Sequence, residues 1–344
     1  MKKRTRKIIS VMLFVLLNAV VISMTAFSEF HNSEGAAEIE EIRLRWWFLV
    51  PAVAVFVVAI LANVYKYVLM IRNADTAGNL KKREIWKLAW RVVMLGKYYD
   101  NVTPAAVGGQ PFQIYYMRKN SRLPKGQMTS IPIVGMIAGQ IGFLVVAVIC
   151  FIFGGVQETN PALFVTAWLG LLFFAFWPVL VFGINFFPKP TTRFIKFVVK
   201  ILAKMRIIKN REKALEKVEE EVREYVKSVN TILKTKGLFF KVVVLSTLFQ
   251  ILTMAIPFFV LTAFGGEMTF IKCFVLTVAV TSAVYFVPTP GNSGAAEGTF
   301  FVVFSALTRG YVFWAMLVWR FFSYYIYIIV GLLIYLKMQI EKKK

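Results

Sequence analysis

The chain has 344 residues, of which 58% are hydrophobic, 16% aromatic and 17% charged, and its formal net charge is +23. Soluble domains carry about 45–50% apolar and about 25% charged residues, so this composition argues against a soluble protein. The positive charge does not indicate a nucleic-acid partner, because the basic residues stand between long apolar runs. The single histidine argues against a His-based catalytic triad and a multi-His metal site. The two cysteines lie in apolar stretches, which argues against a disulfide framework and a Cys-rich metal site.

Six apolar stretches are long enough to cross a bilayer, whose core of roughly 30 Å needs about 20 helical residues. They lie at about 8–27, 46–71, 127–153, 162–187, 237–264 and 311–336. The first follows a basic segment, as a signal peptide does, but it exceeds the usual apolar length of about 7–15 residues. We expect a retained helix there, and one integral membrane domain over 1–344.

Lysine and arginine are distributed unevenly between the loops, which predicts the orientation of the spans. The segments 1–7, 72–87, 118–126, 188–236 and 337–344 hold 32 of the 41 basic residues. The opposite loops hold three basic residues and seven acids. Because basic residues collect on the cytoplasmic side, both termini are expected to be cytoplasmic.

A first interrupted apolar stretch, at about 85–116, has basic residues at both ends, so both ends belong on the cytoplasmic side. Proline removes a backbone donor, and glycine tolerates a tight reversal. The return arm, about 110–117, is too short to cross the bilayer. A re-entrant hairpin from the cytoplasm is therefore predicted, with the breakers Pro104, Gly108, Gly109 and Pro111.

A second interrupted stretch, at about 270–307, has neither end on the basic side. It is therefore expected to enter from the outside, and the depth of its tip is left open. Its centre reads FVPTPGNSGAAEGTFF. The predicted tip residues are Pro288, Pro290, Gly291, Gly294 and Gly298.

Two broken hairpins that enter from opposite faces are typical of the inverted repeats of transporters. Unwound backbone at membrane depth is tolerated only where protein or a watery cavity covers it. The alternative is a pair of kinked packing helices, but a single kink rarely needs four or five breakers together. The predicted fold is thus all-α and polytopic, with about six full transmembrane helices plus two oppositely oriented re-entrant hairpins.

Six basic residues fall within the membrane stretches, where an ionisable side chain costs several kcal/mol and tends to face a cavity or a partner. Lys66, Lys241 and Lys272 lie near span ends, so we expect them to snorkel to water without a functional role. Arg320 sits well inside its span, where snorkelling is difficult. Glu297 on the second hairpin is its expected partner.

Polar residues of the first hairpin form a second candidate set, in which Asp100 is expected to lie near Arg91 and Lys97. The functional interpretation is a hydrophilic path for a charged lipid headgroup, since an arginine fork suits phosphate. The alternative is a set of buried structural ion pairs. The predicted substrate-binding residues are Arg320, Glu297, Asp100, Asn101, Arg91, Gln110 and Gln113; no catalytic residue or metal ligand is predicted.

Four further residues of the apolar helices suggest helix packing rather than chemistry. Gln140 and Gln250 are expected to make hydrogen bonds between helices. Gly135 and Gly139 form a GxxxG pattern, which favours close helix approach.

The segment 188–236 is the sizeable soluble element expected of this chain. Its first half is basic and amphipathic, which is typical of a cytoplasmic helix lying on anionic lipids. Its second half has an apolar stripe that favours packing on a neighbour or a homodimer. About fifty residues cannot hold a nucleotide-binding or acyltransferase domain, and no Walker loop, GxGxxG or zinc motif occurs, so no cofactor is expected.

Three runs carry a resemblance to a known family: PTPGNSGAAEG, NVTPAAVGGQPFQIYYMRK and WRFFSYY. They resemble the lysylphosphatidylglycerol synthase transmembrane region, the flippase-like part of the bacterial multiple peptide resistance factor and of stand-alone membrane proteins. The resemblance covers nearly the whole chain. It implies a bacterial plasma membrane protein that moves aminoacylated phosphatidylglycerol outward and lessens the binding of cationic antimicrobial peptides. The resemblance implies a functional role for the residues that match the family's motifs, which are Pro104, Gly108, Gly109, Pro290, Gly291, Gly294, Glu297 and Arg320.

Two departures from the family bear on activity and substrate. Full-length members carry a soluble domain that moves the aminoacyl group from tRNA to the lipid, whereas this chain ends at Lys344. The physical case for transferase activity is therefore poor. Gln110 and Gln113 stand where charged residues are common in the family, which leaves the substrate open.

The leading hypothesis is a translocase for an anionic or aminoacylated phospholipid such as lysylphosphatidylglycerol, moving it downhill or with an ion because no ATP motif occurs. The alternative is a phosphatidylglycerol lysyltransferase that uses lysyl-tRNA, alone or with a separate aminoacyltransferase. A third hypothesis is a membrane scaffold without transport. Anionic membrane lipids are expected partners under each.

Overall fold

The structure is a computed structural model that describes residues 44–103, 108–156, 161–187, 235–307 and 311–341, and isolated positions between 190 and 230. These residues form helices and connecting turns without strands, as predicted. The expected span 8–27, the breaker Pro104 and nearly all of the segment 188–236 lie outside the described residues.

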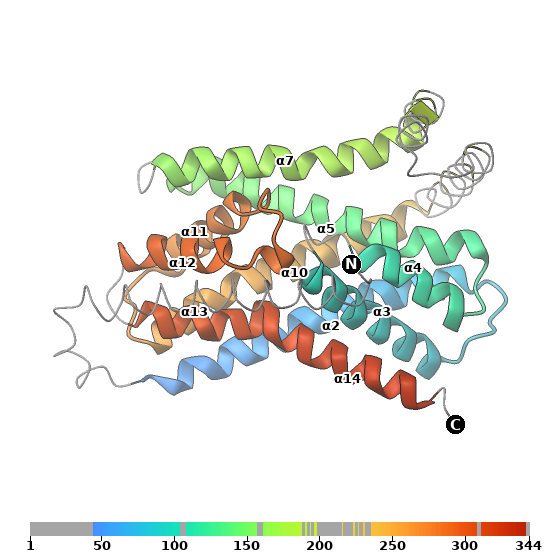
Figure 1. Cartoon of the computed structure of the whole chain (residues 1–344), viewed down its shortest axis with the longest axis horizontal. Helices are drawn as coiled ribbons and strands as arrows, with labels where there is room; N and C mark the ends of the chain where they lie inside the picture. Colours follow the sequence, from blue (N-terminus) through green and yellow to red (C-terminus); the bar gives the residue numbers. More distant parts are fainter. Residues whose placement is uncertain are drawn as a thin grey trace, which may run out of the picture.

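Four helical runs among the described residues are long and apolar enough to cross a membrane, and a fifth helix of similar length accompanies them. Five of the six predicted spans are therefore present as helices, and the chain is an all-α polytopic membrane protein (Figure 1). These runs are η3 (Trp46–Phe48) with α2 (Leu49–Ala74), α5 (Lys125–Phe153), α7 (Pro161–Phe186), α10 (Lys236–Ala263), and α13 (Val312–Arg320) with η6 (Phe321–Tyr325) and α14 (Ile326–Glu341).

The first predicted hairpin is formed by α3 (Lys82–Val102) and α4 (Gly109–Asn120). Both of its outer ends lie at one end of the molecule, because short turns join α3 to α2 and α4 to α5. At this end the Arg118 side chain donates to Thr129 Oγ1 on α5 at 2.9 Å. Figure 1 shows the hairpin reaching inward from the side where α14 ends.

The second predicted hairpin is formed by α11 (Phe270–Ala283), η5 (Pro290–Asn292) and α12 (Ala295–Ser305). Its outer ends meet at the other end of the molecule, where the Tyr311 amide donates to the Phe264 carbonyl at 3.1 Å. The tip at η5 packs against α3. The two hairpins therefore enter from opposite ends and meet inside the helix assembly (Figure 1).

Small residues allow the helices to approach closely, as is common in membrane bundles. A side chain at Gly142 of α5 would lie 2.8 Å from the Thr247 amide nitrogen of α10. A side chain at Gly170 of α7 would collide with the Ser282 carbonyl of α11. These two glycines let α5 pack closely on α10, and α7 on α11.

The last membrane-spanning run changes to a π-helix at η6, immediately after Arg320. Single π-helical turns inside α-helices are rare and often lie at functional sites. This turn faces the second hairpin tip, so the irregular parts of three segments lie at one level of the molecule.

Candidate functional site

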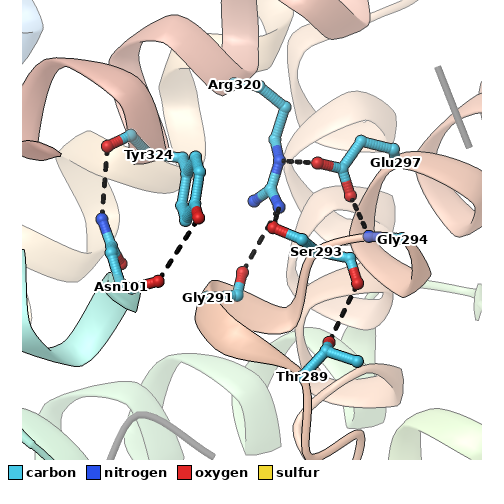
Figure 2. Close-up of polar contacts among 8 residues, drawn as sticks. All are labelled: Asn101, Thr289, Gly291, Ser293, Gly294, Glu297, Arg320 and Tyr324. Atoms are coloured by element: carbon cyan, nitrogen blue, oxygen red, sulfur yellow. Dashed lines mark hydrogen bonds and ion pairs between the residues drawn. The ribbon is translucent and has the colours of Figure 1, made fainter. Parts of the chain in front are cut away.

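Arg320 and Glu297 form a buried ion pair, in which Arg320 Nε donates to Glu297 Oε1 at 2.7 Å (Figure 2). Glu297 lies in the first turn of α12, and its other oxygen, Oε2, accepts the Gly294 amide at 2.7 Å. Gly294 has φ +89°, a conformation that favours glycine. The start of α12 therefore positions the carboxylate that meets the last residue of α13, and the predicted pairing is confirmed.

The guanidinium of Arg320 is surrounded by protein groups. Its Nη2 donates to the Gly291 carbonyl at 3.3 Å and to Ser293 Oγ at 3.4 Å (Figure 2). The ring of Tyr324 lies 4.9 Å from the guanidinium carbon and the ring of Trp319 5.6 Å. The side chains of Arg320 and Glu297 are 6% and 2% exposed. In this conformation the pair fastens the second hairpin tip to the last span.

A reciprocal pair of hydrogen bonds joins Asn101 at the first hairpin tip to Tyr324 of η6 in the last span. Asn101 Nδ2 donates to the Tyr324 carbonyl at 3.2 Å, and the Tyr324 hydroxyl donates to the Asn101 carbonyl at 3.3 Å (Figure 2). Gly291 lies between them with φ +58°, and a Cβ there would overlap the Tyr324 ring. The first tip, the second tip and η6 thus meet at one point.

Polar side chains close the tip of the first hairpin. Asp100 Oδ1 accepts the Gly109 amide at 2.9 Å, and Thr103 Oγ1 accepts the Gly108 amide at 2.9 Å. Both amides lie at the start of α4, where helical N–H groups lack partners within the helix. Gly108 and Gly109 are therefore tip residues, as predicted, and Asp100, which was predicted to bind substrate, accepts a tip amide and stabilises the reversal of the chain.

The predicted glutamines lie on α4. Gln113 is buried; its Nε2 donates to the Val92 carbonyl at 3.0 Å, and Oε1 accepts the Tyr67 hydroxyl at 3.4 Å. Gln110 is half-buried in the first turn. Gln113 therefore ties α4 to α3 and α2.

Arg91 does not lie beside Asp100, contrary to the sequence-based prediction. Its Nη2 donates to both carboxylate oxygens of Glu341 on α14, at 3.2 Å each. Nine residues of α-helix separate Arg91 from Asp100, which is about 13 Å along the axis. Lys97, by contrast, stands three residues before Asp100 on the same helix face and interacts with it electrostatically, as expected.

Two other expectations were wrong. Lys66 does not reach water: it is 4% exposed, and its ammonium donates to the Gly135 carbonyl of α5 at 3.2 Å. Lys66 lies on the face of α2 that packs against α5, so its side chain points into the bundle although the end of the helix is near. Gly298 is not a tip residue, since it lies inside α12 with open space beside its Cα. The other glycines and prolines lie at the tip: Pro288 in the exposed turn, Pro290 and Gly291 in η5, and Gly294 before α12.

The packing predictions for α5 hold in part. Gln250 Nε2 of α10 donates to the Gly139 carbonyl at 3.3 Å, which is the expected bond between helices. Gly135 leaves room for the Tyr67 ring, whereas Gly139 has open space beside it. The Gln140 Oε1 atom is buried and has no hydrogen-bond partner among the described residues.

Sequence reasoning missed three positioning residues: Tyr324, Ser293 and Tyr67. Tyr324 stands four residues after Arg320, so helical spacing predicts that it shares its face. The contact of Tyr324 with the first hairpin depends on the tertiary arrangement and leaves no signal in the sequence. Among the described residues, no group of three or more His, Cys, Asp or Glu side chains could hold a metal ion.

Comparison with known proteins bears on the whole chain. The family model described as the lysylphosphatidylglycerol synthase TM region matches residues 7–331. Comparisons with curated proteins and with solved structures each gave no match. The matched range includes both hairpins, the ion pair and the π-helical turn. The chain therefore belongs to the lysylphosphatidylglycerol synthase TM region family.

Proposed function

We propose that this protein moves a phospholipid with a charged headgroup between the leaflets of a bacterial plasma membrane, with both termini in the cytoplasm. Lysylphosphatidylglycerol and its anionic parent lipid are the proposed substrates, in keeping with the family. The observation that supports the proposal most strongly is that the tips of two oppositely oriented hairpins meet inside the bundle, where η5 packs against α3 and Asn101 bonds to Tyr324 of η6. Outward movement of the aminoacylated lipid would make the cell surface less anionic and lessen the binding of cationic antimicrobial peptides.

The contact between the first hairpin tip and η6 is a barrier made of weak bonds. Two neutral hydrogen bonds join Asn101 and Tyr324, and each contributes about 1 kcal/mol. Such a barrier can open without unfolding the helices around it. Broken helices lining a central site are the common architecture of proteins that expose one site to each side in turn.

The Arg320–Glu297 pair lies next to this barrier and supplies a group suited to phosphate. When the pair opens, the guanidinium presents a planar fork of donors that matches two phosphate oxygens. The lipid tails would remain in the bilayer while the headgroup passes the tips. Movement is downhill or coupled to an ion in this proposal, and anionic lipids, a separate aminoacyltransferase and a second copy of the chain are proposed partners.

The test uses purified protein in vesicles that contain a fluorescent phosphatidylglycerol in both leaflets, with an impermeant quencher added outside. Wild-type protein should expose the inner-leaflet label faster than vesicles without protein. The rates measured with fluorescent lysylphosphatidylglycerol and fluorescent phosphatidylcholine then show which headgroup the protein prefers. A wild-type rate equal to that of empty vesicles for every label would refute the proposal.

A further inference from the structure

A buried lysine inside the membrane has no anionic partner among the described residues. Lys66 of α2 is 4% exposed, and its ammonium donates to the Gly135 carbonyl and lies 5.3 Å from the centre of the Tyr67 ring. An ammonium carries three donors, so two N–H groups remain beyond the bond to Gly135. Within the described part of the chain, no carboxylate forms an ion pair with it.

A second lysine increases the positive charge at this place. Lys97 of α3 is half-buried, lies 5.5 Å from the centre of the Phe249 ring, and interacts electrostatically with Lys66. Asp100 is the carboxylate that interacts with Lys97, and one of its oxygens already accepts the Gly109 amide. When both lysines are protonated, the single Asp100 carboxylate leaves an excess positive charge where a charge costs several kcal/mol. An anionic ligand would remove that cost.

The surroundings indicate that the ligand belongs to a lipid. Tyr65, next to Lys66, stacks on Trp86 of α3 with ring centres 6.1 Å apart. Both rings are 43% exposed, and Trp90, one turn further along α3, is 37% exposed. Exposed tyrosine and tryptophan on membrane helices mark the headgroup level of the bilayer. Lys66, the neighbour of Tyr65, therefore lies just inside the depth at which phospholipid phosphates are found, and Lys97 lies roughly 16 Å further along α3 than Trp86.

We propose that Lys66 and Lys97 bind the phosphate of an anionic phospholipid headgroup between α2 and the first hairpin. This inference rests on the proposed function and gives it an entry site, distinct from the Arg320–Glu297 pair at the tips. Lysine suits this task as a compact charge with rotatable donors. Tyr67 and Gln113, which bond each other beside Lys66, hold α2 and α4 around the site.

The experiment measures equilibrium binding of radiolabelled phosphatidylglycerol to the full chain in a neutral detergent, with no transport involved. The variants are Lys66→Met and Lys97→Met, and the matched control is Lys241→Met, an exposed lysine on α10. Loss of one charge-assisted bond should weaken binding about tenfold in each variant and leave the control unchanged. Phosphatidylglycerol should also raise the melting temperature of the wild type but not that of Lys66→Met.

Equal binding by wild type and both variants would overturn the proposal. Displacement of the lipid by inorganic phosphate would overturn the assignment to a lipid, because it would identify a site for a soluble anion. Equal binding of diacylglycerol would overturn the role of the phosphate. A Lys66→Met protein that melts at or above the wild-type temperature without lipid shows that lost binding is not lost folding.

The vesicle assay separates this inference from the proposed function. If wild-type protein moves lipid while Lys66→Met binds it normally, the entry site is wrong and the function stands. If binding depends on Lys66 but no lipid moves, the site stands and the translocase proposal fails.

Discussion

The protein holds two groups of charged side chains within its helices, and they are organised in opposite ways. At the hairpin tips, one cation meets one carboxylate at 2.7 Å, and backbone and hydroxyl groups occupy further donors. Beside the first hairpin, Lys66 of α2 has a single carbonyl acceptor and a second lysine nearby. A closed, neutral pair is suited to holding two segments together, whereas an unneutralised group is suited to binding a ligand. Four substitutions test this difference between the two groups.

The largest effect is expected from removing one partner of the closed pair. Glu297→Gln leaves the Arg320 charge buried without its carboxylate, and this should destabilise the protein by about 3–5 kcal/mol. Thermal unfolding in detergent measures the loss. The double variant Glu297→Gln with Arg320→Met should recover much of the stability, and a double variant as unstable as the single one would contradict the ion-pair explanation.

Gly291→Ala should have the next largest effect. The backbone has φ +58° there, and the new Cβ would overlap the Tyr324 ring, so we expect a loss of about 2 kcal/mol and separation of the tips. Hydrogen exchange at the amides of residues 291–294 should increase. Gly298→Ala is the matched control, because open space surrounds Gly298 and alanine favours the helix. Equal effects of both changes would refute the proposed contact.

A smaller effect is expected from weakening the contact between Asn101 and Tyr324 without changing the shape of the tyrosine ring. Tyr324→Phe removes the hydroxyl bond to Asn101, about 1 kcal/mol, and should raise lipid movement about fivefold by weakening the barrier. The vesicle assay measures this rate. Tyr325→Phe, a neighbour in the same π-helical turn, should leave the rate unchanged. A slower rate for Tyr324→Phe would show that the contact belongs to the moving state.

Arg91→Ala should have the smallest effect. The pair with Glu341 is partly exposed, with side chains 14% and 45% exposed, so its loss should cost at most about 1 kcal/mol. Lipid movement and lipid binding should both match the wild type. A clear loss of either would restore Arg91 to the substrate path from which the geometry separates it.

The hairpins and spans were predictable because each depends on local chemistry. Runs of apolar residues require helices in a bilayer, and clustered proline and glycine require a chain reversal. The Arg320–Glu297 pairing was also predictable. A charge deep in a span needs a partner, and Glu297 is the acidic residue of the second hairpin. The surroundings of Arg91 and Lys66 were predicted wrongly because the prediction used only their positions along the helix. Which groups they contact depends on how the helix is rotated about its axis and on the helices beside it.

The amino-acid sequence alone determined the all-α membrane fold, its two interrupted hairpins and the identity of the ion pair. The reason is that burial of apolar residues and the cost of an unpaired charge act on each segment wherever its neighbours lie. The packing of the helices was needed to show that the first hairpin tip bonds to η6 through Asn101 and Tyr324, that Arg91 is bound by α14, and that Lys66 points inward. Those contacts depend on how the helices are rotated against each other, and that rotation results from the summed packing of the whole bundle.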